Sequence, residues 1–308
     1  MILTITLNPA IDMSYRMNTL ELDTVNRCSN VIKTAGGKGI NVTRVIRLAG
    51  KDVCATGFLG GTNGQFISEE LNAIGADHQF LQIDGNTRNC IAILHDHGKQ
   101  TEILEDGPEI KQEDAIRFIS MFEHMIDSYE VITASGSLAK GLPSSFYRQL
   151  ISIANEKGKK FILDTSGDAL KEGIEAKPFL IKPNREELSK LIGNDVQSID
   201  DVKQAILSLK RYEIPFIVVS LGADGALGFY KDQFYKITPP NIDAVNPVGS
   251  GDSMIAGLAI AISEGFSPEK IFAYGSAFGT LNAMEEKTGY INQSLIDSFV
   301  EQTMVELL

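Results

Sequence analysis

Short apolar runs alternate along the chain with stretches that show helical periodicity. Ile2–Leu7 has the composition of an opening strand, and several later runs are almost wholly apolar. Such runs suit strands that are covered on both faces, as in a parallel sheet. The later strands that we expect are Val131–Ala134, Phe161–Leu163, Phe179–Ile181 and Phe216–Leu221.

The segments between these runs have the spacing of amphipathic helices. After Gly39, apolar residues recur on one helical face, namely Val42, Val45, Ile46 and Ala49. Further helices are expected at Ser145–Glu156, Arg185–Ile192 and Asp200–Arg211, and two long ones after Gly251 and Pro268. Strands that alternate with helices predict an α/β fold with a mostly parallel sheet.

Two segments depart from this α/β alternation. Met13–Lys33 has no convincing helical pattern, and Arg88–Leu104 has the pattern of a hairpin. The hairpin would consist of strands Asn89–His95 and Gln100–Leu104, joined by a turn at Asp96–Lys99. Together these segments predict a small β-structure outside the main sheet. It is either a lid over a ligand cleft or an excursion of the sheet edge packed on the core.

The chain has 308 residues and no linker rich in Pro, Gly or Ser. A length of this size allows about two domains or one large α/β domain. We expect a single domain over residues 1–308, with the lid built from about residues 12–34 and 87–106.

The charge of the chain excludes some classes of partner. Its 28 Lys and Arg against 40 Asp and Glu give a formal net charge of −12. Binding to duplex nucleic acid or to an anionic membrane surface requires an excess of basic residues. Small anionic ligands remain compatible, because they respond to local charge. The three cysteines form no CxxC motif and there is no signal peptide, so we expect a cytoplasmic protein.

Two common phosphate-binding motifs are absent from the sequence. No Gly-Lys pair is followed by Ser or Thr, as a Walker A loop requires. The best match to a G-x-G-x-x-G dinucleotide fingerprint begins at Gly249, but Met254 stands where the third glycine belongs. A nucleotide, if bound, must therefore be held by another type of loop.

The strongest candidate for chemistry is Asn246–Ser253, which precedes the apolar helix that starts near Met254. Gly249, Ser250 and Gly251 place backbone N–H groups at a helix N-terminus, where anions bind. Asp252 follows directly. It is either a plain helix cap or a general base beside a transferred phosphoryl group. The motif alone leaves these two interpretations balanced.

Two further segments carry polar groups at strand-to-helix junctions. Thr34–Asn41 combines glycines with the cation Lys38 and with Asn41, which can both donate and accept hydrogen bonds. A tight turn would explain the glycines but not both polar groups. Asp12 follows the first strand, and the carboxyl ends of parallel strands are where such sheets bind ligands. Asp12 could hold two sugar hydroxyls or cap a turn.

An ordered set of motifs that spans essentially the whole chain resembles the PfkB carbohydrate kinases of the ribokinase-like superfamily. These motifs are NPAID at Asn8–Asp12, GGKGIN at Gly36–Asn41, TRNC at Thr87–Cys90, SGSLAKGLP at Ser135–Pro143, DTSGDAL at Asp164–Leu170, KPNREEL at Lys182–Leu188, VSLGADGA at Val219–Ala226 and NPVGSGDSM at Asn246–Met254. The resemblance implies a three-layer α/β/α ribokinase-like sandwich with a small β-sheet lid. One departure is Ala139-Lys140, where the family usually has proline after SGSL; we interpret Lys140 as solvated.

The resemblance also implies roles for single residues. Asp252 would be the catalytic base, with Gly249, Ser250 and Gly251 as the anion hole. The residues that would hold the sugar are Asp12, Gly37, Lys38 and Asn41, while Arg88, with Arg27 as a weaker second candidate, would bind its phosphate. The residues that would contact ATP are Lys182, Asn184, Ser220, Gly222, Gly225 and Asn282. Asn184 and Glu187 match an N-x-x-E element that is linked to Mg²⁺, indirectly through water and the ATP phosphates.

Within the family, the sub-pattern most resembles the branch that phosphorylates D-tagatose 6-phosphate at its C1 hydroxyl, in lactose and galactose breakdown. The segments that carry this are KTAGGKGINVTRV, TRNCIAILHDHGKQTEILEDGPEI, VNPVGSGDS and LNAMEEKTGYIN. The alternatives are a 1-phosphofructokinase or 6-phosphofructokinase of the same family, and a sugar-phosphate sensor without catalysis. The family resemblance further implies a homodimer through the lid. Both substrates are anions, so we expect Lys38 and Arg88, with Arg27, to form a positive cleft.

Overall fold

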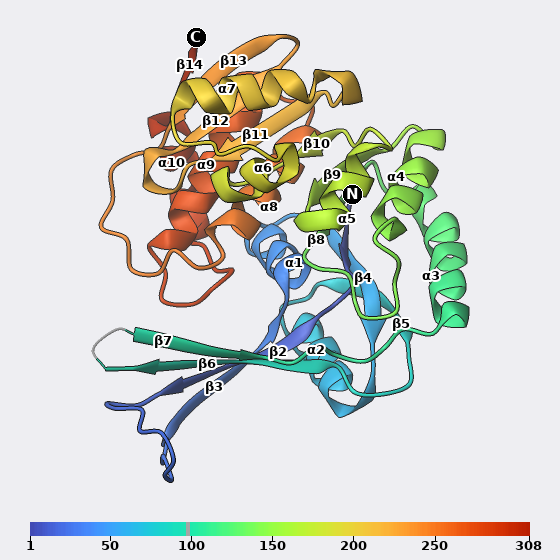
Figure 1. The fold of residues 1–308 in the computed structure, drawn as a ribbon, viewed down its shortest axis with the longest axis vertical. Coiled ribbons are helices and arrows are strands. Elements are labelled where there is room, and N and C mark those ends of the chain that lie inside the picture. Colours follow the sequence, from blue (N-terminus) through green and yellow to red (C-terminus); the bar gives the residue numbers. More distant parts are fainter. Residues whose placement is uncertain (97–98) are drawn as a thin grey trace.

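The computed structural model describes residues 1–96 and 99–308. Within these ranges the larger of two sheets has ten strands, in the order β14-β13-β12-β11-β10-β9-β8-β1-β4-β5 (Figure 1). The strands are β1 (Ile2–Thr6), β4 (Val53–Leu59), β5 (Asp77–Gln82), β8 (Val131–Ser135), β9 (Lys160–Asp164), β10 (Leu180–Ile181), β11 (Phe216–Ser220), β12 (Ala226–Tyr230), β13 (Gln233–Thr238) and β14 (Met304–Leu307).

Seven neighbouring strands of this sheet, from β5 to β11, run parallel, and β12 to β14 extend it in antiparallel fashion. The five strands expected from apolar runs are all present as β1, β8, β9, β10 and β11. Because the parallel strands point the same way, their carboxyl ends meet along one edge, which is where sheets of this kind bind ligands.

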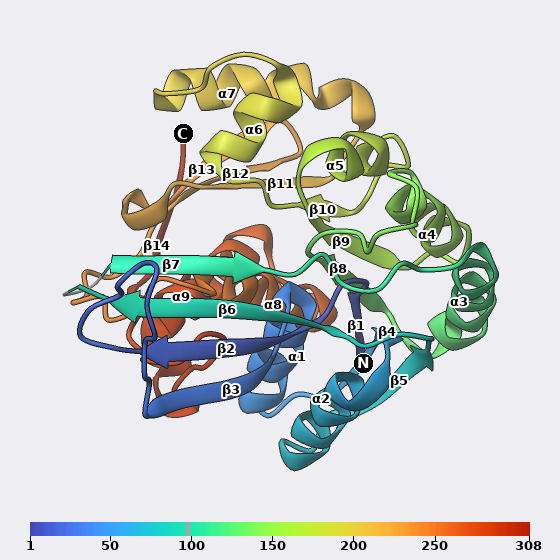
Figure 2. The same ribbon diagram turned by 60° about the horizontal axis from the view of Figure 1, so that its bottom comes forward.

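Helices cover both faces of the large sheet (Figures 1 and 2). One layer packs into a core with α1 (Lys38–Leu48), α2 (Gly61–Ala73), α8 (Ser250–Ser263), α9 (Pro268–Ala283) and α10 (Ile296–Gln302). The opposite core contains α3 (Gln112–Met125), α4 (Phe146–Glu156), α5 (Gly167–Ile174), α6 (Arg185–Ile192) and α7 (Ile199–Ser208). Strand β1 serves both cores, since Ile2 packs in the first and Leu3 in the second. The predicted α/β/α sandwich is therefore confirmed.

A separate sheet of four strands extends from the lower side of the body in Figure 1. Its strands, in the order β3-β2-β6-β7, are β3 (Asn30–Gly36), β2 (Ala10–Arg16), β6 (Arg88–His95) and β7 (Lys99–Leu104). Ala10 on β2 pairs with Gly36 on β3 and with Arg88 on β6. The register therefore brings three of the recognised motifs together at the base of this sheet.

The small sheet agrees with the predicted hairpin strands within one residue at each end. The turn expected at Asp96–Lys99 includes residues 97 and 98, which lie outside the described residues. Among the helices of the described ranges, none is long and apolar enough to cross a lipid bilayer.

Candidate active site

The turn before α8 can be built only with glycine at position 249. Gly249 has a φ of 85°, and a Cβ there would lie 2.6 Å from Thr288 Cγ2. Residues other than glycine rarely adopt that backbone angle. Within the described residues, the N–H groups of Gly251 and Asp252 donate to no protein acceptor. These two donors at a helix N-terminus form an anion hole.

Asp252 is the third residue of α8, and its side chain makes no capping hydrogen bond. The interpretation of Asp252 as a plain N-cap is therefore wrong. The residue is 7% exposed, and its Oδ2 accepts a hydrogen bond of 2.8 Å from Asn41 Nδ2 on α1. Burial, reinforced by Asp164, raises the pKa of Asp252 to about 6, against the opposing effect of Lys38. A carboxyl group with this pKa is suited to general-base chemistry near neutral pH.

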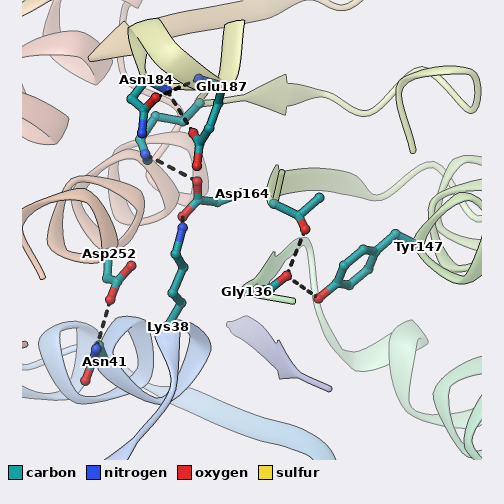
Figure 3. A network of polar contacts seen from close by, with 10 residues as sticks. Lys38, Asn41, Gly136, Tyr147, Asp164, Asn184, Glu187 and Asp252 are labelled. Carbon is teal, nitrogen blue, oxygen red and sulfur yellow. Dashed lines mark hydrogen bonds and ion pairs between the residues drawn. The ribbon is translucent and has the colours of Figure 1, made fainter. Parts of the chain in front are cut away.

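A buried carboxylate between two lysines borders the anion hole. Asp164, at the end of β9, is 2% exposed, and its Oδ1 lies 3.3 Å from Lys182 Nζ. Its Oδ2 lies 3.7 Å from Lys38 Nζ, and Figure 3 shows Lys38 extending from α1 toward this carboxylate. The neighbouring Asp164 carboxylate raises the pKa of Lys38, and this effect is larger than the opposing effect of burial. Lys182 Nζ also lies 3.4 Å from where a Cβ on Gly251 would be, so its charge faces the anion hole.

Asp164 was not among the site residues predicted from the sequence. It belongs to the DTSGDAL motif, and the signal that could have identified it is an acidic residue that directly follows a buried apolar strand. A carboxylate in that position needs a cation or several donors to remain charged. The strand order brings those cations from α1 and from the residue after β10.

The N-x-x-E element has a structural role in the chain itself. Asn184 is the N-cap of α6, its Oδ1 accepts from the backbone N–H of Glu187, and Glu187 Oε2 accepts from the N–H of Asn184 (Figure 3). This reciprocal capping box is favoured by the sequence spacing. Within the described residues, Glu187 Oε1 has no hydrogen-bond partner, which leaves one carboxylate oxygen available for a ligand.

Asp12 lies within β2 of the small sheet, and therefore caps neither a helix nor a turn. Its carboxyl group fills the space above Gly36, where a Cβ would lie 2.2 Å from Asp12 Cγ. Burial raises the pKa of Asp12 to about 6, although Arg44 and Arg88 oppose this shift. Gly36 thus makes room for an acidic group at the junction of the small sheet with α1.

Arg88, the first residue of β6, is half-buried beside the loop that follows β1. Its Nη2 donates to the carbonyl oxygen of Asn8 at 3.2 Å, and its Nη1 donates to that of Glu105 at 3.1 Å. These bonds hold the guanidinium plane while using only some of its five N–H donors. Arg27, in contrast, is exposed in the connection between β2 and β3, and no ion pair joins it to the other predicted residues in the described ranges.

The predicted nucleotide residues divide into two groups. Ser220 ends β11 beside Asn184, with which it forms a bridge. The turn that follows begins at the exposed Gly222 and ends at the buried Gly225. A Cβ on Gly225 would lie 2.1 Å from Ile237 O, so this turn also requires glycine. These positions lie at the carboxyl end of the parallel strands.

Asn282 on α9 is fully buried, at 0% exposure, and so has no surface with which to contact an adenine. Its Nδ2 donates to Val248 O at 2.9 Å, and its Oδ1 accepts from Gly289 N at 2.8 Å and from Ser253 Oγ at 3.1 Å. Asn282 therefore stabilises the turn in which the anion hole lies. We correct the expectation that Asn282 contacts ATP accordingly.

The charges of the site are balanced rather than positive. The basic groups are Lys38, Arg44, Arg88 and Lys182, and the carboxylates that face them are Asp12, Asp164, Asp252 and Glu187. The expectation of a positive cleft is thus corrected: backbone N–H groups must supply much of the attraction for phosphate. Lys140 lies apart, with its Nζ 3.7 Å from an exposed Glu109 carboxylate, as expected of a solvated lysine.

Comparison with known proteins agrees with this geometry. The model of the pfkB family carbohydrate kinases matches residues 2–294. The chain belongs to this family, and it is accordingly a phosphotransferase that uses ATP as a substrate.

Two kinds of relative illustrate the likeness. The tagatose-6-phosphate kinase of Staphylococcus epidermidis is 46% identical over 308 residues, with 99% of each chain covered. Among solved structures, phosphofructokinase-2 of Escherichia coli in complex with potassium has a TM-score of 0.92 at 26% identity, covering 97% of this chain and 98% of that chain. The same enzyme in complex with fructose-6-phosphate has a TM-score of 0.90, with the same identity and coverage.

Proposed function

We propose that this protein transfers the γ-phosphoryl group of ATP to the C1 hydroxyl of D-tagatose 6-phosphate, yielding ADP and tagatose 1,6-bisphosphate. The observation that carries the proposed chemistry is the position of Asp252 directly beside two free N–H donors at the start of α8. The choice of sugar rests on the 46% identity to the tagatose-6-phosphate kinase of S. epidermidis over nearly both whole chains.

In this proposal, Asp252 accepts the proton of the C1 hydroxyl as that oxygen attacks the γ-phosphoryl group. The N–H groups of Gly251 and Asp252, in the turn formed by Gly249 and Ser250, hold the phosphoryl oxygens during transfer, and Lys182 adds a positive charge beside them. Phosphoryl transfer depends mainly on orientation and on charge stabilisation. The base therefore contributes less than the correct alignment of the two substrates does.

The sugar would lie between the base of the small sheet and α1. Asp12 is placed to accept from two hydroxyl groups. Gly37 packs against the loop after β1, where a Cβ would lie 3.2 Å from Pro9 Cα, and as a glycine it presents only backbone to a ligand. Lys38 and Asn41 project from the first turns of α1. The N-terminus of α1 and the guanidinium of Arg88 would then share the recognition of the 6-phosphate.

Arg88→Ala is expected to raise KM for the sugar phosphate about 10- to 100-fold, because a charge-assisted, bidentate contact is lost. KM for ATP should change little, since Arg88 lies at the small sheet rather than near the turn at Gly222. Steady-state kinetics with each substrate varied in turn provide the measurement. Arg16→Ala, on the exposed end of β2, is the matched control. Equal increases in both KM values for Arg88→Ala would contradict the role.

ATP would occupy the edge of the sheet between the α8 turn and the turn after β11. Ser220, Gly222 and Gly225 line that second turn, and Asn282 supports the first from within. Mg²⁺ fits the residues present, because Glu187 Oε1 has no hydrogen-bond partner among the described residues and can serve as a carboxylate ligand. Mg²⁺ is commonly held through one or two carboxylates, water and substrate phosphates. When bound, it would offset charge on the ATP oxygens, with Asn184 and Glu187 holding it through water.

We further propose that residues 1–308 form one domain, with the small sheet as a lid that pairs with a second copy of the chain. Its outer strands β3 and β7 carry exposed apolar side chains, namely Val31, Ile32, Ile103 and Leu104. Outer strands also have unpaired backbone groups. Because successive residues of a strand point to opposite faces, Ile32 and Leu104 lie on one face of the small sheet and Val31 and Ile103 on the other. Exposed apolar side chains gathered on one small sheet are typical of an interface.

Sedimentation of the protein at micromolar concentration is expected to give a dimer. The double substitution Ile32→Lys and Ile103→Lys should shift it toward the 33.6 kDa monomer, because charges would be buried without partners. Ile116→Lys, an exposed isoleucine on α3 outside the small sheet, should leave the dimer intact. A wild-type protein that sediments only as a monomer would contradict this arrangement.

The proposed reaction is tested by ADP release with tagatose 6-phosphate, fructose 6-phosphate and fructose 1-phosphate as acceptors. We expect the highest kcat/KM with tagatose 6-phosphate, and ³¹P NMR of the product should show a new ester at C1. The alternative with specific support is a 6-phosphofructokinase, because the complex of E. coli phosphofructokinase-2 with fructose-6-phosphate has a TM-score of 0.90 to this chain. Release of ADP with none of the three would contradict both.

A further inference from the structure

Arg44 is a buried cation on α1 that has no part in the roles described above. It lies one turn after Asn41, and the residue is only 4% exposed. Within the described residues, no carboxylate oxygen lies within 4.0 Å of its guanidinium. Burying a charge is costly unless it gains good hydrogen bonds. The hydrogen-bond partners of Arg44 must therefore offset the cost of burying its charge.

Acceptors from three parts of the chain surround this guanidinium. Nη1 donates to Asn41 Oδ1 at 2.9 Å and to Thr288 O at 3.4 Å, and Nη2 donates to the carbonyl oxygen of Ala35 on β3. Arg44 Cζ also lies over the ring of Tyr290, 5.3 Å from its centroid. All of these acceptors are uncharged and directional, so the contacts specify an orientation rather than neutralise a charge.

The orientation of the Asn41 amide determines how Asp252 is held. Asn41 Nδ2 donates to Asp252 Oδ2 at 2.8 Å, while Asn41 Oδ1 is the atom that accepts from Arg44. If the amide were turned over, its oxygen would face the carboxylate. Two acceptors repel each other unless one carries a proton, so a turned amide would favour protonated Asp252.

We propose that Arg44 is a positioning residue that acts through Asn41. By donating to Asn41 Oδ1, it keeps the amide nitrogen directed at Asp252 Oδ2, which stabilises the ionised carboxylate and leaves the second carboxylate oxygen to receive the substrate proton. This inference rests on the proposed role of Asp252 as the base. The bond to Ala35 also connects this relay to strand β3 of the small sheet.

The surroundings of both groups define what else can influence their titration. The charged groups that face Asp252 are Asp164 from β9, Lys38 from α1 and Lys182 from the segment after β10. The titratable groups that face Arg44 are Tyr290, Asp12, Glu70 and Asp252. Replacing Arg44 leaves these three neighbours of Asp252 in place, but it also removes a charge that itself faces Asp252. The relay is therefore measured by the part of the titration shift that disappears when Arg44→Gln is made in an Asn41→Ala background.

The first test is the pH dependence of kcat for Arg44→Met and Arg44→Gln. Both neutral variants should move the acid limb of the profile upward by about one pH unit, because one stabilising bond to the carboxylate is lost, and this shift alone should lower kcat at pH 7 about twofold. Arg44→Lys, which keeps a charge and a donor, should return the limb toward its wild-type position. Arg47→Met, one turn further along α1 and partly exposed, is the matched control and should leave the profile unchanged.

The second test does not depend on which substrate is used. The carboxyl carbon of Asp252 can be titrated by ¹³C NMR in labelled protein and identified by its disappearance in Asp252→Asn. Its pKa should be higher in Arg44→Gln than in the wild-type protein. If that shift is seen with Asn41 present and is absent in an Asn41→Ala background, but the wild-type protein phosphorylates no sugar phosphate, the relay stands and the proposed function fails. If the wild-type enzyme is active and its Asp252 titration superimposes on that of a folded neutral variant, the relay is overturned. If neither neutral variant folds, the test falls to Arg44→Lys. An acid limb displaced in Arg44→Lys as far as in Asn41→Ala would then overturn the relay as well.

Discussion

Asp252→Asn should lose about a thousandfold in kcat, the range over which a positioned general base contributes to catalysis. The substitution removes the only proton acceptor proposed for the C1 hydroxyl, yet it keeps a side chain of the same size beside Asn41. Binding of the sugar phosphate, measured by calorimetry, should therefore change little. Asp168→Asn, an exposed aspartate in the first turn of α5, provides the matched control and should retain full activity. Near-normal turnover in Asp252→Asn would exclude Asp252 as the base.

The same substitution should make the protein more stable above neutral pH. Burial favours the protonated form of Asp252 in the folded state and raises its pKa from 3.8 to about 6. Its stabilising contribution is therefore complete below pH 3.8 and lost as the pH rises through about 6. At about 1.36 kcal/mol for each pKa unit, the raised pKa of Asp252 lowers the free energy of unfolding of the wild-type protein by on the order of 3 kcal/mol at pH 8. The unfolding midpoint of Asp252→Asn should exceed that of the wild type at pH 8, and this difference should shrink at pH 4. An unchanged difference would indicate that Asp252 is not held with a raised pKa.

Lys182→Met is expected to have the largest effect on stability, together with a severe loss of turnover. Removing this ammonium leaves the Asp164 carboxylate, whose side chain is 1% exposed, with only Lys38 at 3.7 Å. Breaking one side of a buried ion pair typically costs about 3 to 5 kcal/mol. The anion hole also loses the charge that lies beside Gly251. Urea unfolding and kcat, measured on the same preparation, test both parts.

The double variant Lys182→Met with Asp164→Asn separates these two effects. Neutralising the carboxylate should restore most of the lost stability, because no unpaired buried charge remains, but it should not restore kcat. Lys190→Met is the matched control on the exposed face of α6, where Lys190 pairs with Glu186, and it should alter neither property noticeably. Recovery of kcat in the double variant would mean that Lys182 serves only to balance Asp164.

Local features of the site could be predicted from the sequence because they are set by residues close together in the chain. The glycine at position 249 and the N-x-x-E spacing specify a turn and a capping box over a few residues each. Apolar periodicity likewise defines the strands buried on both faces, such as Val131–Ser135. Strands such as β4 and β5 escaped prediction because Thr56 and Gly57 interrupt the apolar run of β4, and because β5 begins with three polar residues and has only Phe80 and Leu81 as apolar ones.

The remaining parts of the site depend on contacts between distant segments. Asp164 meets Lys38 and Lys182 only because the strand order places β9 beside β8 and β10. The amide of Asn282 is turned inward by the packing of α9 on α8, which is invisible in its local sequence. For this reason the structure assigns Asn282 to the support of the turn rather than to ATP contact. Asp252 lies beside the anion hole, where its motif placed it.

Internal competition between the two 6-phosphates tests the central claim most directly. An equimolar mixture of tagatose 6-phosphate and fructose 6-phosphate is supplied with limiting ATP, and the two bisphosphates are quantified by NMR. Their ratio equals the ratio of the two kcat/KM values, independent of enzyme concentration. We predict that tagatose 1,6-bisphosphate is the major product and that its new ester is at C1. Predominant formation of fructose 1,6-bisphosphate, or consumption of ATP without phosphorylation of either sugar, would contradict the account.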